Sequence, residues 1–90
     1  MDLSFDPKKD RINQQKHGVS LVEAERIEWD TALEQLYDRA DYHEDRYIGL
    51  GFIGARLYCV VYVDRQDSRR IFSLRKANAR EVNYYVEANR

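Results

Sequence analysis

The chain has 90 residues, of which 43% are hydrophobic and 34% are charged, and its formal net charge is −1. This length predicts one soluble domain over residues 1–90, with a thin core and no room for a large cofactor cavity. No apolar run is long enough to span a membrane, and the first residues lack the basic start and apolar stretch of a signal peptide. The single cysteine, Cys59, excludes an internal disulfide, so these features together favour the cytoplasm.

The charges are unevenly distributed along the chain. Between residues 23 and 45, nine acidic residues stand against two arginines, whereas between residues 65 and 80 six basic residues stand against one aspartate. A concentrated basic end binds phosphates even when the net charge is near zero. A solvated surface with accidental clustering explains the pattern equally well, so charge alone does not indicate nucleic acid.

The first third of the chain predicts a short strand followed by two helices. A strand over 3–5 precedes a helix from residue 8 to about 17, with Asp6 as N-cap, Pro7 at the first helical position and Gly18 at the C-terminal end. This helix is almost entirely polar, so most of its surface should face water or a ligand. Ser20 and Glu23 have the spacing of a capping box, which predicts a second helix with its apolar residues toward the core.

The rest of the chain predicts strands and a last helix. Segment 31–45 fits either one more helical turn or an edge strand, followed by an exposed acidic loop over 38–45. Alternating or apolar patterns predict an antiparallel meander of strands over 46–52, 57–63 and 69–74, with 57–63 in the centre. Simple alternation places Arg70 with Phe72 and Leu74 and places Arg75 on the other face, so the two arginines share a site only if the strand ends or bulges. Asn78 and Glu81 then predict the cap of a final helix.

These elements predict an α+β fold in the order β-α-α-β-β-β-α. Helices should cover one face of a small antiparallel sheet, which leaves the other face open for RNA or a protein partner.

Two segments stand out in the first part of the chain, namely Phe-Asp-Pro-Lys at 5–8 and Asn-Gln-Gln-Lys-His-Gly-Val-Ser at 13–20. They resemble the first half of the BrnT family of bacterial toxins, formerly a family of unknown function. The matches continue with 23–24, Ile27, Asp30, 46–51, 60–62, Arg65 and 70–81. The departures are Trp29, Phe72, Leu74 and Asn78, which are packing or cap substitutions, and segment 33–45 matches least well.

The resemblance implies a RelE-like fold and a ribonuclease that arrests translation. It also implies a BrnA-type antitoxin with a ribbon-helix-helix domain, a heterotetramer of the two proteins, and contact with promoter DNA only through the antitoxin.

The residues themselves show no metal-binding signature and no cofactor motif. Cleavage of RNA without a metal needs a group that activates the 2′-hydroxyl, cations that offset the charge on phosphorus, and a proton donor for the leaving oxygen. With the family motif in view, we predict the catalytic residues to be Lys16, His17, Arg46, Arg65 and Arg75. We further predict RNA contacts from Arg70, Lys76, Arg80 and Tyr84.

Alternative interpretations stand beside these assignments. Lys16 and His17 could simply complement the dipole of the helix that they end, and Tyr84 could be an ordinary half-exposed tyrosine. Cys59 lies within an apolar run and is predicted to be an inert buried residue. The whole chain could also be a binding module that has lost activity and acts only as a co-repressor with its antitoxin.

Overall fold

The computed structural model describes residues 2–37 and 45–90. The strands are β1 (Asp2–Ser4), β2 (Leu33–Tyr37), β3 (Arg46–Ile53), β4 (Arg56–Arg65) and β5 (Ser68–Lys76). The helices are α1 (Pro7–His17) and α2 (Ala79–Ala88), and two 3-10 segments, η1 (Leu21–Arg26) and η2 (Trp29–Thr31), lie between α1 and β2. The mixed α+β class predicted from the sequence is confirmed, although the element order differs from the predicted one.

The five strands form one sheet in the order β1-β5-β4-β3-β2. The predicted antiparallel meander is confirmed for β3, β4 and β5, and β1 adds to it as a parallel edge strand beside β5. Segment 33–37 pairs with β3 as the opposite edge strand and not as a helical turn. The expected acidic loop falls mostly on residues 38–44, which lie outside the described residues.

One face of the sheet, here called the packed face, holds Tyr58, Val60 and Tyr62 of β4. Buried residues of η1 and of the following turn cover it, as predicted from their apolar character: Leu21, Ala24 and Ile27. The prediction of an α-helix here is wrong, because the segment is a 3-10 helix. Its two buried residues, Leu21 and Ala24, lie three positions apart, so they are on the same side of a helix with three residues per turn, and the C-cap Ile27 follows at the same spacing.

The predicted capping box at Ser20 is also only partly present. The Ser20 hydroxyl accepts from the Val22 N–H, but the Glu23 carboxylate accepts from Arg26 at 2.7 Å. The Leu21 N–H donates to the Asp10 carboxylate of α1 at 2.8 Å. A side chain from another element therefore contributes to the start of η1.

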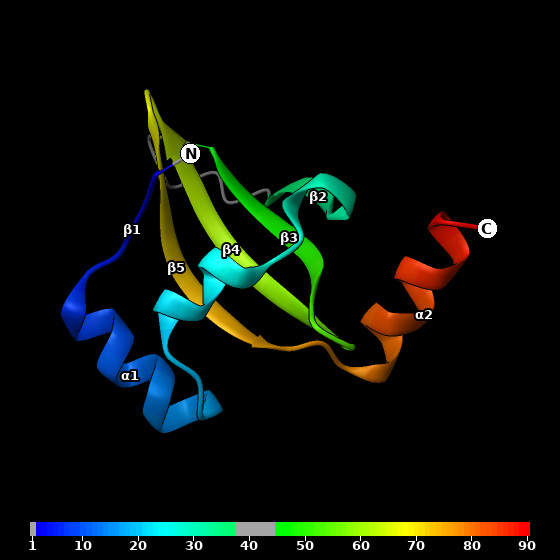
Figure 1. The fold of residues 1–90 in the computed structure, drawn as a ribbon, viewed down its shortest axis with the longest axis horizontal. Coiled ribbons are helices and arrows are strands. Elements are labelled where there is room, and N and C mark those ends of the chain that lie inside the picture. The colour runs from blue at the N-terminus through cyan, green and yellow to red at the C-terminus, as the bar shows by residue number, and fades with distance from the viewer. Residues whose placement is uncertain (1, 38–44) are drawn as a thin grey trace.

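The opposite face, here called the open face, carries Leu57, Cys59 and Val61 of β4 by strand alternation. The prediction that the helices cover one face alone is wrong. The Tyr85 ring of α2 packs edge-on against Phe52 on this side, with the ring centroids 5.4 Å apart. The chain leaves β5 at Lys76, and the Asn78–Glu81 capping box starts α2 close to the end of the sheet (Figure 1). The short connection keeps α2 at this end, so within the described residues no helix crosses the middle of the open face.

Helix α1 lies beside β5, where β1 no longer pairs with it (Figure 1). Its predicted caps are confirmed: Asp6 accepts from the Lys8 N–H, and Gly18 adopts the left-handed conformation with φ of 71°. The buried side chain of Asn13 donates to the Leu74 carbonyl at 2.7 Å and accepts from the Leu74 N–H at 3.1 Å. The Asn13 amide thus replaces a neighbouring strand and attaches the helix to the edge of β5.

A β-bulge interrupts the pairing of β4 with β5. Val61 lies opposite Ser73 and Tyr62 lies opposite Ile71, so Phe72 is the extra residue. Ile71 and Leu74 consequently both belong to the core of the packed face, which corrects the simple alternation predicted for this strand. The inserted residue reverses the alternation on its two sides, and Arg70 and Arg75 therefore share the open face.

Candidate functional site

The open face brings several of the predicted site residues onto one side of the sheet. In β5, Arg70 lies opposite Val63, Ser73 opposite Val61 and Arg75 opposite Cys59. In β3, Arg46 lies beside the Tyr47–Tyr62 pair, which places it next to Val63 on this face. The bulge is the reason that a single strand presents two arginines to the same side.

A hollow of about 180 Å³ lies between α1 and the bulge. Five residues of α1 line it, namely Lys9, Ile12, Asn13, Lys16 and His17, and Phe72 and Ser73 of β5 complete it. Lys9 and Lys16 are seven residues apart, so two turns of helix put both ammonium groups on the same side of α1. We call this feature the α1 hollow.

Lys16 and His17 are both exposed at the end of α1. Within residues 2–37 and 45–90, neither side chain makes a hydrogen bond or an ion pair, and the same holds for Arg70. These side chains are accessible to an external anion. Their position in the last helical turn also stabilises the helix dipole, so this structural role coexists with a functional one.

The Phe72 ring lies between charged groups from two other elements. The Cζ atom of Arg46 is 4.2 Å from the ring centroid, and the Nζ atom of Lys9 is 5.5 Å from it. Phe72 therefore links Arg46 on β3 to the α1 hollow.

Arg75 lies two residues beyond Ser73 but is bound within the protein. Its guanidinium donates two hydrogen bonds of 2.8 Å to the Glu81 carboxylate, the same carboxylate that accepts from the Asn78 N–H. This contact lowers the pKa of Glu81 and raises that of Arg75. Nearby, burial raises the pKa of the Cys59 thiol to about 11, as expected for an inert cysteine.

The other predicted residues lie farther from the α1 hollow. Arg65 ends β4 opposite Ser68, at the hairpin end of the sheet that Arg46 also approaches. Lys76 is the exposed last residue of β5. Arg80 and Tyr84 of α2 line a separate hollow of about 240 Å³ with β2 and β3, and Tyr84 is 51% exposed. The structure does not gather all nine predicted residues into one cavity.

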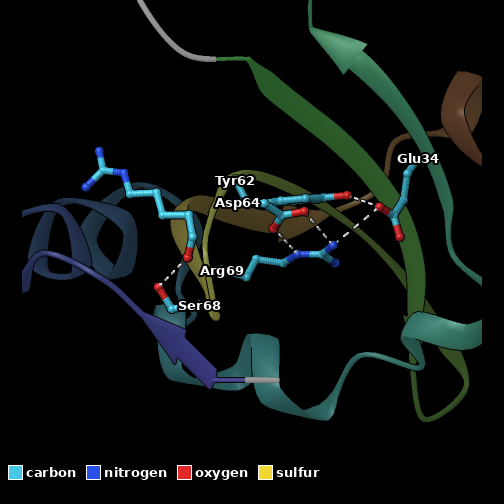
Figure 2. Close-up of polar contacts among 6 residues, drawn as sticks. Glu34, Tyr62, Asp64, Ser68 and Arg69 are labelled. Atoms are coloured by element: carbon cyan, nitrogen blue, oxygen red, sulfur yellow. Dashed lines mark hydrogen bonds and ion pairs between the residues drawn. The ribbon is translucent and has the colours of Figure 1, made fainter.

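Arg69, one of the six cations between residues 65 and 80, lies on the packed face and is neutralised there. Figure 2 shows its guanidinium beside Asp64, with N–O distances of 2.6 and 3.0 Å, and beside Glu34 at 3.8 Å. The rings of Trp29 and Tyr62 lie against it, and the Arg69 side chain is only 12% exposed. Burial and the hydrogen bond to Glu34 raise the pKa of the Tyr62 hydroxyl. These groups satisfy one another, so the cluster supports the fold and offers no charge to RNA.

The remaining hollows and donor groups suggest no competing site. A larger hollow of about 400 Å³ is lined partly by the carboxylates of Asp2 and Glu25, which would repel phosphate. Within the described part of the chain, no group of three or more His, Cys, Asp or Glu residues is arranged to hold a metal ion. No helix of that part is both long and apolar enough to cross a membrane.

Several residues of this site were not predicted from the sequence. Lys9 could have been found, because it lies seven residues before Lys16 on the same helix face. No local pattern in the sequence indicates the roles of Asn13 and Phe72. Asn13 acts by binding the edge of β5, and Phe72 reaches its position through the register shift between β4 and β5.

A family model described as the ribonuclease toxin BrnT of type II toxin–antitoxin systems matches residues 5–81. The chain belongs to the BrnT family. Its match covers α1, the whole sheet from β2 to β5 and the start of α2, and thus every residue of the α1 hollow. A search of curated proteins finds no match to the chain. BrnT membership identifies a ribonuclease toxin family and implies an antitoxin partner.

Proposed function

We propose that this BrnT-family protein cleaves RNA without a metal ion and thereby arrests translation in the cytoplasm. The observation that carries the proposal is the α1 hollow, where Lys16 and His17 lie beside Ser73 and the Phe72 bulge, within a chain of a ribonuclease family. Arg46 and Arg70 extend positive charge from this hollow across the open face.

The reaction proposed for this site is attack by the RNA's own 2′-hydroxyl. A base removes the 2′-hydroxyl proton, the 2′-oxygen attacks phosphorus, the bond from phosphorus to the 5′-oxygen breaks, and that oxygen takes a proton. The products are a 2′,3′-cyclic phosphate and a 5′-hydroxyl. His17 is the proposed proton-transfer group, because histidine changes charge near neutral pH, and Lys16, Arg46 and Arg70 offset the charge on phosphorus. We place Arg75 and Arg65 at the margins of the proposed site. Arg75 supports the site indirectly, through its ion pair with Glu81.

Purified protein tests this proposal directly. RNA fragments with cyclic phosphate ends are expected in the presence of EDTA, and His17→Ala should slow their formation by about 10²- to 10⁴-fold, the usual contribution of an acid–base group. Arg11→Ala, at an exposed α1 position that does not line the hollow, is the matched control and should cleave at the parental rate. Cleavage that disappears with EDTA and returns with a divalent ion would refute the metal-free mechanism.

We further propose a BrnA-type ribbon-helix-helix antitoxin that covers the open face, in a heterotetramer that reaches promoter DNA through the antitoxin. The open middle of this face supports this arrangement, as does Arg70, which makes no hydrogen bond or ion pair within the described residues. Expression of the chain alone should slow growth, and co-expression of the neighbouring gene should restore it. If soluble protein leaves growth and RNA unchanged but still binds that partner, the inactive co-repressor is the better description.

A further inference from the structure

The β-bulge in β5 places an aromatic ring where a regular strand would not. Phe72 has no partner in β4, because Val61 pairs with Ser73 and Tyr62 pairs with Ile71. Its side chain nevertheless reaches Arg46, which is on β3, with the whole of β4 between them. Neighbouring strands lie about 4.8 Å apart, so β5 and β3 are separated by roughly 10 Å. The ring and the arginine stem must therefore meet above β4 on the open face.

The geometry of this contact is that of a cation–π interaction. The guanidinium carbon of Arg46 lies 4.2 Å from the ring centroid, within the range in which a ring attracts a cation. On the α1 side, the Lys9 ammonium lies 5.5 Å from the same centroid, and Phe72 and Lys9 both line the α1 hollow. The ring thus contacts one cation of the sheet and one of the hollow.

We infer that Phe72 is a positioning residue that holds the Arg46 guanidinium toward the phosphate bound at the α1 hollow. The inference rests on the proposed function. Arginine has many side-chain conformers, and a long side chain on an open sheet face loses them when it binds an anion. A ring beneath the guanidinium removes part of that loss before RNA arrives, so the bound RNA is stabilised without touching Phe72.

A double-mutant cycle separates this role from simple packing. The four proteins are the parent, Phe72→Leu, Arg46→Ala and the double variant; leucine keeps an apolar side chain but removes the ring. Binding is measured by fluorescence anisotropy with a short RNA whose 2′-hydroxyls are methylated, so that no cleavage occurs. Phe72→Leu should weaken binding by about 3- to 30-fold in the parent, the range of a cation–π contact, and by less than about twofold in the Arg46→Ala background. Equal losses in both backgrounds, or no loss in the parent, would overturn the inference.

Rescue and folding controls complete the experiment. Phe72→Tyr keeps the ring and should bind RNA as the parent does; a loss as large as that of Phe72→Leu would count against the inference. If Phe72→Leu fails to fold, as judged by its urea midpoint, Phe72→Met takes its place in the same cycle.

A readout without RNA distinguishes this inference from the proposed function. The Arg46 side-chain N–H resonance should be shifted upfield by the Phe72 ring in the nuclear magnetic resonance spectrum, and the shift should vanish in Phe72→Leu. If the Arg46 resonance is shifted by the Phe72 ring but the protein neither binds nor cleaves RNA, the proposed function is refuted, whereas the contact between Phe72 and Arg46 is confirmed. RNA binding that depends on Arg46 without any ring shift would refute the positioning role of Phe72 alone.

Discussion

At the scale of single residues, two polar side chains of α1 determine where the helix lies. Asn13 bonds both the N–H and the carbonyl of Leu74, and its amide also donates to the Val19 carbonyl at 2.9 Å. Asp10 accepts from the Leu21 N–H and from the Ser20 hydroxyl. A helix with so few apolar residues has little packing energy of its own, so these directional bonds attach it to β5 and η1.

Asn13→Ala should therefore destabilise the protein by about 1–3 kcal/mol, because it leaves the buried N–H and carbonyl of Leu74 without partners. Urea unfolding followed by circular dichroism measures the change. Gln15→Ala on the same helix is exposed and should stay within about 0.5 kcal/mol of the parent. Similar midpoints for both variants would show that α1 is held by something else.

Asp10 also gives the fold a pH dependence at the acid end. The Leu21 N–H, together with the Ser20 hydroxyl, lowers the pKa of the Asp10 carboxyl in the folded state. A carboxyl group whose pKa is lowered by folding stabilises the folded state at pH values above its unfolded pKa, which is about 3.9 for aspartate. That stabilisation is lost as the pH falls through the pKa of the folded state. The urea midpoint of the parent should thus fall more steeply below about pH 4 than that of Asp10→Asn. Parallel curves for the two proteins would contradict this assignment.

At the scale of elements, glycines in β3 let the 3-10 segments approach the sheet. A Cβ built on Gly51 would lie 2.7 Å from Cγ2 of Ile27 and 3.3 Å from Cβ of Ala32. Ile27 is a buried core residue, so it has little freedom to move aside. A Cβ built on Gly49 would be less crowded, because its nearest atom, Cγ1 of Val60, would be 3.1 Å away.

We expect Gly51→Ala to cost about 1–3 kcal/mol through overpacking beneath Ile27. Thermal or urea unfolding provides the measurement, and Gly49→Ala should have the smaller effect of the two. The pair Gly51→Ala with Ile27→Ala should cost less than the sum of the two single substitutions, because loss of the Ile27 side chain removes the clash. A neutral Gly51→Ala variant would mean that the contact between the 3-10 segments and β3 is looser than the structure shows.

At the scale of the whole molecule, the basic stretch of the sequence is divided between two faces. Arg69 is neutralised on the packed face by Asp64 and Glu34, and Arg75 is held by Glu81. The cations around the α1 hollow come largely from α1, which lies outside the basic stretch. The charge that we propose for RNA binding is therefore assembled by the fold from distant segments.

This arrangement predicts a salt-dependent affinity for RNA. If about three phosphates are contacted, the logarithm of the binding constant should fall with the logarithm of salt concentration with a slope of about −2. Lys9→Ala should reduce that slope by about 0.7, the value for one phosphate on a single strand. Arg56→Ala, at an exposed position on the packed side, is the control and should leave the slope unchanged. An equal change in the two variants would argue for diffuse attraction in place of the α1 hollow.

Local patterns in the chain were enough to predict the features that depend on near neighbours. The caps of α1 and α2 form between residues two to four positions apart, and the apolar run 57–63 is the centre of the sheet because it has no polar face. The family motifs, which include Lys16 and His17, could be recognised for the same reason, because each is a short run of neighbouring residues.

The way these elements meet depends on contacts between residues that are far apart in the sequence. The 3-10 form of η1 depends on Asp10 and on the sheet beneath it, the neutralisation of Arg69 depends on Glu34, and the bulge at Phe72 depends on how β5 pairs with β4. A one-residue shift of register moves every later side chain to the other face, so simple alternation placed Arg70 and Arg75 apart when the fold puts them together. Such pairings join residues that are distant in sequence, and their free energies are settled by packing and hydrogen bonding that no local pattern records.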